Sequence, residues 1–262
     1  MKHLGVLMAT ALAILCGTIP ARADDLQRIL DAGTLRAGVC LTAEPAGYRD
    51  GENIPRGYDV DMAGLLAEGL GVKLELVEVT GPTRMPQLLS GAIDVIICNI
   101  TATPERAKSI DFSFPYLRTG IKLLVQRNAG IAGFDDIGAD RSLIVGRGTT
   151  GEAMAKARAP EAGFIYVENP GDAILLLRQG EADAYVEDSL AIDYIAKAYP
   201  DLLEALPEVY SSDAICFGIR KGNPDFLRWL DLFASIYVSS GKYAEIYGKW
   251  WGEPPPALTP VW

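Results

Sequence analysis

An arginine that follows two threonines is the clearest candidate for binding chemistry in this sequence. Arg106 comes shortly after Thr101 and Thr103, and Thr103-Pro104 has the form of a helix N-cap with proline at the first helical position. The helix dipole disfavours a cation in this first turn by about 0.3–1 kcal/mol. A guanidinium beside free N–H groups and hydroxyls can, however, bind a carboxylate bidentately. We therefore predict that Arg106 binds an anion; the alternative is a surface arginine on a helix.

The elements before these residues should place them at the edge of a sheet. Residues 95–97 form a β-rich apolar run that predicts a buried strand of a parallel sheet, and Asn99 lies just beyond its end. Ligands of open α/β sheets bind beyond the carboxyl ends of the strands. Two more polar segments should reach the same edge: Thr149-Thr150 at a helix start, and Asp188 after the strand of residues 182–186. Either segment could instead only cap its own helix.

The rest of the chain alternates strand and helix patterns, so we predict two α/β units with helices outside largely parallel sheets. At 262 residues with 49% hydrophobic content, the chain can bury one large core or two smaller ones. The expected strands cover residues 34–40, 73–79, 95–97, 120–126, 143–146, 182–186 and 214–220. The expected helices cover residues 26–32, 60–70, 171–179, 189–198, 224–239 and 241–250, with one more between the second and third strands.

One long motif carries a resemblance to a known family. The pattern GxxD(V/L)I…(S/T)xTxxR…FSxPY is matched by Gly91, Asp94, Thr101, Thr103, Arg106, Phe112, Ser113, Pro115 and Tyr116. The chain thus resembles the bacterial extracellular solute-binding proteins for polar amino acids, which are type II periplasmic binding proteins of ABC uptake systems. The likeness extends over almost the whole chain after residue 23.

The resemblance implies an α/β fold of two lobes, each a mostly parallel sheet flanked by helices, with a cleft between them. Lobe 1 would be discontinuous, comprising residues 24–117 and 215–262, and lobe 2 would comprise residues 118–214. The chain would cross between the lobes near residues 117–122 and 210–215. Because neither crossing is a long linker, we expect a hinge between rigid bodies.

The resemblance also implies the roles of the polar residues at the cleft. Arg106 would bind the α-carboxylate of an amino acid, and Thr101, in the segment that begins at Asn99, would bond its head group. The N–H groups of the turn at Thr149 and Thr150 would complete this carboxylate site. Asp188 would pair with the α-ammonium, although Glu187 is an alternative. Such partners are needed because a zwitterion is costly to take from water.

The part of the pocket for the ligand side chain departs from the family pattern. Many members carry an aromatic pair after the first strand, but here residues 42–48 contain Glu44 and no such pair. The stretch around Arg84 resembles a motif of acidic amino-acid binders in which the arginine contacts a distal carboxylate. In that motif Gly81 replaces a serine, and Pro170 stands where those binders have a histidine. We therefore expect an anionic or amide side chain; the alternative is a solvent-facing Arg84.

Residues 1–23 have the form of a secretory signal peptide. A weakly basic start at Lys2-His3 is followed by the apolar residues 4–15 and by the small-x-small site Ala21-Arg22-Ala23. We therefore expect export to the periplasm, and no later stretch is apolar enough to span a bilayer.

The charge and histidine content exclude several function classes. Removal of Lys2 and Arg22 from the 24 basic residues leaves 22 against 34 acidic residues, a net charge of −12. This charge argues against nucleic acid or anionic lipid as a partner. The only histidine, His3, lies in the signal peptide. We therefore expect no metal site and no cofactor.

Three cysteines remain after the signal peptide: Cys40, Cys98 and Cys216. Cys40 and Cys98 end two strands that the family fold places side by side, so a disulfide between them is one alternative. Buried unpaired thiols that act as small hydrophobic groups are the alternative we favour.

Together these features predict a monomeric binding protein that delivers an amino acid or similar carboxylate to an inner-membrane ABC permease. We expect no enzyme activity. The alternatives are a dehydratase of the cyclohexadienyl or arogenate type, with Glu44 or Glu187 as general acid, and a ligand-sensing module.

Overall fold

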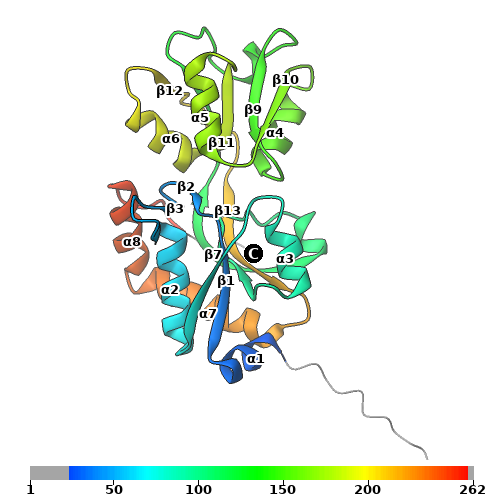
Figure 1. Ribbon diagram of the computed structural model, residues 1–262, viewed down its shortest axis with the longest axis vertical. Coiled ribbons are helices and arrows are strands. Elements are labelled where there is room, and N and C mark those ends of the chain that lie inside the picture. The colour runs from blue at the N-terminus through cyan, green and yellow to red at the C-terminus, as the bar shows by residue number, and fades with distance from the viewer. Residues whose placement is uncertain (1–23, 259–262) are drawn as a thin grey trace, which may run out of the picture.

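The computed structural model describes residues 24–258, which form two lobes stacked along the long axis of the molecule (Figure 1). Each lobe contains one five-stranded sheet with helices on both faces. The predicted signal peptide, residues 1–23, lies outside the described residues. Within residues 24–258, no helix combines the length and apolar character required to cross a membrane.

The sheet of lobe 1 has the strand order β5-β1-β6-β13-β7. Its strands are β1 (Thr34–Val39), β5 (Lys73–Glu78), β6 (Val95–Ile96), β7 (Ile110–Thr119) and β13 (Asp213–Arg220). The hairpin strands β2 (Thr42–Ala43), β3 (Gly47–Arg49) and β4 (Pro55–Arg56) form a separate small sheet. The helices of this lobe are α1 (Asp25–Ala32), α2 (Tyr58–Leu70), α3 (Arg84–Ser90), α7 (Pro224–Ser239) and α8 (Lys242–Trp251).

The sheet of lobe 2 has the strand order β10-β9-β11-β8-β12. Its strands are β8 (Ile121–Gln126), β9 (Ser142–Gly146), β10 (Gly163–Val167), β11 (Ala184–Asp188) and β12 (Leu203–Ala205). Helix α4 (Thr150–Arg158) covers one face, and α5 (Pro170–Gln179) and α6 (Ser189–Ala198) cover the other. A short 3₁₀ turn, η2 (Phe134–Asp136), lies between β8 and β9.

In each sheet one strand runs against the parallel strands. β13 pairs antiparallel with β6 and β7, and β8 pairs antiparallel with β11 and β12. Both sheets are therefore mixed. Two neighbouring strands, β7 and β13, connect the lobes side by side (Figure 1).

Most expected elements are present within one to three residues, but two expectations need correction. The helix expected to start at Pro104 is only the 3₁₀ turn η1 (Arg106–Lys108), because the chain enters β7 at Ile110. Thr103 still caps this turn, since its Oγ1 accepts the Arg106 N–H at 3.2 Å. The strands β2, β3, β4, β7, β10 and β12 were not expected from the sequence pattern.

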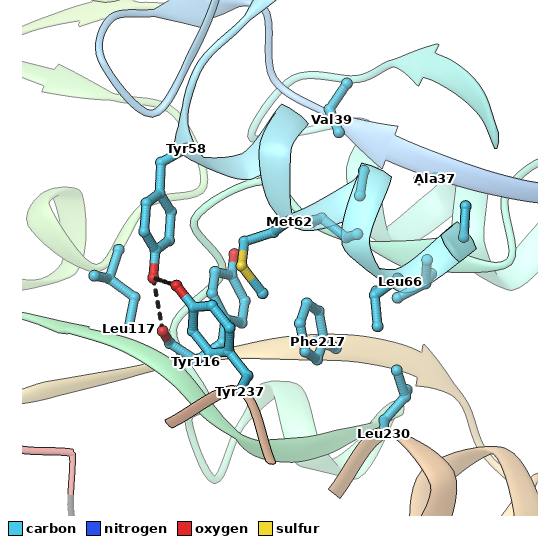
Figure 2. Close-up of a cluster of buried hydrophobic side chains, with 14 of the residues drawn as sticks. Ala37, Val39, Tyr58, Met62, Leu66, Tyr116, Leu117, Phe217, Leu230 and Tyr237 are labelled. Carbon is cyan, nitrogen blue, oxygen red and sulfur yellow. Dashed lines mark hydrogen bonds between the residues drawn. The ribbon is translucent and has the colours of Figure 1, made fainter. Parts of the chain in front are cut away.

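The core of lobe 1 holds the loop that carries the site. Figure 2 shows the hydroxyl of Tyr58, which donates to the Tyr116 carbonyl at 2.8 Å and lies 3.0 Å from the Tyr237 hydroxyl. The Tyr116 hydroxyl donates to Asp59 Oδ1 at 2.9 Å, and Asp59 Oδ2 accepts the Asn99 N–H at 2.9 Å. The cleft loop at Asn99 is therefore tied to the core by a chain of buried hydrogen bonds.

The expectation of unpaired thiols at Cys40 and Cys98 is wrong. The two residues form a disulfide with their Cα atoms 5.0 Å apart, and Cys216 is free and buried. The pairing has a simple cause: β1 and β6 pair in parallel with Ala37 opposite Val95, so the same register places Cys40 opposite Cys98 just beyond the paired residues.

Candidate functional site

A cleft of about 1020 Å³, its open mouth included, lies between the two lobes. Every residue that the sequence indicated for ligand binding lines it: Glu44, Arg84, Asn99, Thr101, Arg106, Thr149, Thr150 and Asp188. Elements of both lobes therefore bring these side chains together, as the carboxyl-edge argument predicts. Within residues 24–258, no group of three or more histidine, cysteine or acidic side chains is arranged to hold a metal ion.

Arg106 spans the cleft from lobe 1 to lobe 2. Its Nη1 donates to the Thr101 carbonyl at 2.8 Å, and its Nη2 donates to the Gly148 carbonyl of lobe 2 at 2.8 Å. These bonds orient the guanidinium and use two of its five N–H groups, so the others can bind a ligand oxygen. The hydroxyls of Thr101 and Thr150 lie 3.5 Å apart on either side of the cleft. Burial lowers the pKa of Arg106.

The turn before α4 uses some of the groups that we expected to bind the carboxylate. Thr149 Oγ1 accepts the Glu152 N–H at 3.1 Å, so this side chain is a helix N-cap. Glu152 Oε2 in return accepts the Gly148 N–H at 2.8 Å. Thr150 begins the helix, where a main-chain N–H has no intrahelical acceptor. Thr150 is therefore the residue of this turn best placed to contact a ligand carboxylate.

Two buried side chains, Asn99 of lobe 1 and Asp188 of lobe 2, face each other across the cleft. Asn99, in the left-handed backbone region at φ 43°, donates from Nδ2 to Asp188 Oδ2. The other oxygens of these side chains, Asn99 Oδ1 and Asp188 Oδ1, are buried and have no hydrogen-bond partner among the described residues. The Asp188 carboxylate makes no capping bond to α6. The arrangement therefore offers acceptors for the N–H donors of an ammonium group.

Glu187, the alternative ammonium partner, is already hydrogen-bonded within lobe 2. Its carboxylate accepts the Tyr185 hydroxyl at 3.0 Å and the Asp188 N–H at 3.0 Å. Burial raises the pKa of Glu187. Burial raises the pKa of Asp188 well above its ordinary value, and the charges of Glu187 and Asp213 act in the same direction. A cation bound at Asp188 would lower the pKa of this carboxyl and so oppose burial and the neighbouring negative charges.

Arg84 is buried in the cleft wall, so the alternative of a solvent-facing side chain is wrong. Its side chain comes from the first turn of α3, and the residue is 5% exposed. Nη1 donates to the Cys98 carbonyl at 2.7 Å, and Arg84 forms no ion pair with any carboxylate within residues 24–258. Burial lowers the pKa of Arg84 to about 10, and the charge of Arg106 contributes. A buried guanidinium in this state favours an acceptor brought by a ligand.

Two further residues at the cleft were not expected from the sequence. Tyr194 of α6 donates its hydroxyl to Glu44 Oε1 at 2.8 Å, which joins the two lobes at the mouth of the cleft. Burial and the Glu44 contact raise the pKa of Tyr194 to about 12. The buried carboxyl of Asp59 also lines the cleft, and burial raises its pKa to about 7. No local sequence signal distinguishes Tyr194 from other helix residues.

A two-lobed α/β fold with a polar cleft between its lobes is the architecture of the type II periplasmic amino-acid-binding proteins. Residues 35–253 match the model of the bacterial extracellular solute-binding proteins, family 3, and the chain belongs to this family.

Three relatives show the range of functions in its neighbourhood. The glutamine-binding protein of Geobacillus stearothermophilus is 32% identical over 80% of this chain and 81% of its own length. The cyclohexadienyl dehydratase of Pseudomonas aeruginosa is 28% identical over 95% of this chain and 94% of its own length. The crystal structure of the ancestral amino-acid-binding protein AncCDT-1, a precursor of cyclohexadienyl dehydratase, is 36% identical. It superposes with a TM-score of 0.82, over 87% of this chain and all of the ancestral one.

Proposed function

We propose that this protein is the amino-acid-binding component of a periplasmic ABC uptake system. One observation carries the proposal: two unpartnered buried acceptors, Asp188 Oδ1 and Asn99 Oδ1, lie in the same cleft as the Arg106 guanidinium. An amino acid carries a carboxylate and an ammonium on the same carbon atom, and each would meet an opposite charge here. The cost of removing a zwitterion from water is then offset at both ends.

Closure of the two lobes on the ligand follows from where these groups lie. Arg106 and Asn99 belong to lobe 1, and Asp188 and Thr150 belong to lobe 2, so a bound amino acid completes contacts that neither lobe offers alone. We place the hinge near residues 117–122 and 210–215, where the chain crosses between the sheets. We further propose that the protein acts as a monomer, after export by its signal peptide, and delivers its ligand to an inner-membrane permease.

Arg84 points to the side-chain class of the ligand. Within residues 24–258, this buried guanidinium donates only to atoms of Cys98, so it can form charge-assisted hydrogen bonds with a ligand carboxylate or amide. We therefore propose glutamate, glutamine or a close analogue as the ligand. The similarity to a glutamine-binding protein is consistent with this class.

A thermal-shift screen with the twenty amino acids and small dicarboxylates, followed by calorimetric titration of each hit, tests the proposal. We expect glutamate or glutamine to raise the melting temperature of the wild-type chain and to lose this effect in Arg106→Ala. The matched control is Arg228→Ala, which removes an exposed arginine of α7 far from the cleft. An equal response of both variants would contradict the proposed carboxylate site.

A second candidate function is a dehydratase reaction in the same cleft. It is favoured by the similarity to a cyclohexadienyl dehydratase and by burial that raises the pKa of Glu187, as a general acid requires. Prephenate lacks an ammonium group, so it would leave the Asp188 carboxylate unpaired. Incubation with prephenate or arogenate, followed by detection of the aromatic product, separates the two functions. Turnover that disappears in Glu187→Gln would establish the enzyme.

A further inference from the structure

Two backbone segments from different lobes touch at one side of the cleft. Gly81 lies between β5 and α3, and an added Cβ at this residue would lie 2.6 Å from the carbonyl oxygen of Arg147 in lobe 2. Contacts of real Cβ atoms below 3.0 Å are essentially never seen. In the other direction, an added Cβ at Gly148 would lie 3.5 Å from the Gly81 carbonyl oxygen.

The conformation of Gly81 does not itself require glycine. Its φ lies outside the left-handed range of +20° to +160°, so a residue with a side chain could adopt the same backbone. The Arg147 carbonyl is the only atom within 3.4 Å of the added Cβ. Glycine is therefore required at this position only while the two lobes are in contact. The family motif that this stretch resembles has a serine here, and a serine carries the Cβ that this contact excludes.

This contact is directly connected to the carboxylate site. Arg147 precedes Gly148, whose carbonyl accepts the Arg106 Nη2 at 2.8 Å. A retreat of this loop by several tenths of an ångström would lengthen that bond and move the start of α4, where Thr150 lies. The spacing of the two lobes at Gly81 therefore controls the geometry of the carboxylate site.

We infer that Gly81 is a positioning residue that sets how closely the lobes close, and hence how tightly the cleft holds its ligand. Any side chain at this position holds the cleft partly open, because its Cβ meets the Arg147 carbonyl oxygen. The inference rests on the proposed function only in that the ligand is an amino acid enclosed by the two lobes.

The test compares Gly81→Ala and Gly81→Val with Gly51→Ala. Gly51 lies in an exposed turn of lobe 1, its φ is also outside the left-handed range, and an added Cβ there meets nothing within 4 Å. Stopped-flow and calorimetric titrations use L-glutamate and L-glutamine as probes. Nitroxide labels on Glu52→Cys and Glu161→Cys, both exposed and on different lobes, report the interlobe distance with and without the probe.

We expect the dissociation constant to rise about tenfold in Gly81→Ala and about a hundredfold in Gly81→Val, the loss typical of weakened charge-assisted hydrogen bonds. The change should lie in the dissociation rate, because closure follows encounter. The unliganded melting temperature should not change, since the open form has no clash, and the interlobe distance distribution should lose its closed component.

Wild-type affinity, dissociation rate and interlobe distances in Gly81→Val would overturn the inference. So would an unliganded melting temperature that falls in Gly81→Val but not in Gly51→Ala, because Gly81 would then be needed within lobe 1 itself. If neither probe binds the wild-type chain, the proposed ligand class fails, and the amino acid that does bind in the thermal-shift screen replaces the probes in the same comparison of Gly81→Val with Gly51→Ala.

Discussion

Replacement of Arg84 by methionine should change which amino acids the protein accepts. Methionine has a similar length and no charge, so it can fill the space of the buried guanidinium in the cleft wall. In the structure, Arg84 donates to the Cys98 carbonyl at 2.7 Å and is 5% exposed, so its other N–H groups face the cleft or its wall. A glutamate or glutamine side chain would lose these donors in Arg84→Met.

The magnitude follows from the energy of hydrogen bonds to a charged group, which is about 1.5–3 kcal/mol. Affinity for glutamate and glutamine should therefore fall roughly ten- to a hundredfold. Affinity for alanine, whose head group is held by other residues, should change by less than about threefold. The unpaired Cys98 carbonyl should cost about 1–3 kcal/mol of unfolding free energy, partly offset by removal of a desolvated charge.

Calorimetric titration of the wild type, Arg84→Met and Arg84→Lys with glutamate, glutamine and alanine measures this change. The lysine variant keeps the charge and should retain part of the preference for glutamate. An equal loss for all three amino acids would show that Arg84 binds the ligand head group. An unchanged ranking would show that the side-chain pocket is formed by Glu44 and its neighbours.

Four further outcomes are expected. Arg106→Ala should abolish amino-acid binding and leave the unliganded melting temperature unchanged, because a ligand carboxylate left without its buried partner costs about 3–5 kcal/mol. Calorimetric titration that finds binding within about threefold of wild type would contradict this. Asp188→Asn should weaken binding of an α-amino acid far more than binding of its deaminated analogue, and equal losses in competition titrations would remove Asp188 from the ammonium site. Small-angle scattering should show a smaller radius of gyration with saturating ligand than without it; an unchanged value with binding confirmed would argue against closure. Burial raises the pKa of the Asp59 carboxyl from 3.8 to about 7, so the folded protein binds a proton at Asp59 more tightly than the unfolded chain does. The stabilisation that comes from this bound proton is lost as the pH rises from 3.8 to about 7. The melting temperature should therefore be higher at about pH 5 than at about pH 8, with a smaller difference in Asp59→Asn; an identical difference would assign the pH dependence to other groups.

Local sequence patterns determined most of the helices and the polar residues that reach the cleft. The helices from α1 to α8 follow from apolar periodicity and from glycines such as Gly71 and Gly180, which end helices at φ 68° and 72°. Arg106 and Thr101 could be predicted because they follow a buried strand, and strand ends of an α/β sheet meet at one edge. These features depend on residues close together in the chain.

The strand β7 shows where local pattern fails. Residues 110–119 contain Pro115 and four polar residues among apolar ones, and their burial does not alternate, because the strand passes from one lobe toward the other. The same entry into β7 cuts short the helix that the Thr103-Pro104 pair predicts. Tertiary context overrode a correct capping signal here.

Only the tertiary structure decided how the cleft is completed. The Cys40–Cys98 disulfide depends on the register of β1 and β6, and the burial of Arg84 depends on the packing of α3 against the Cys98 loop. The contacts of Tyr194 with Glu44 and of Gly81 with Arg147 join segments that lie in different lobes. Helix capping and apolar periodicity are set by a few neighbouring residues. These contacts, in contrast, depend on how all the helices and strands between the two residues pack in three dimensions. A sequence pattern therefore identifies the polar groups of the cleft, and only the packed lobes determine which of them are already paired and which remain for a ligand.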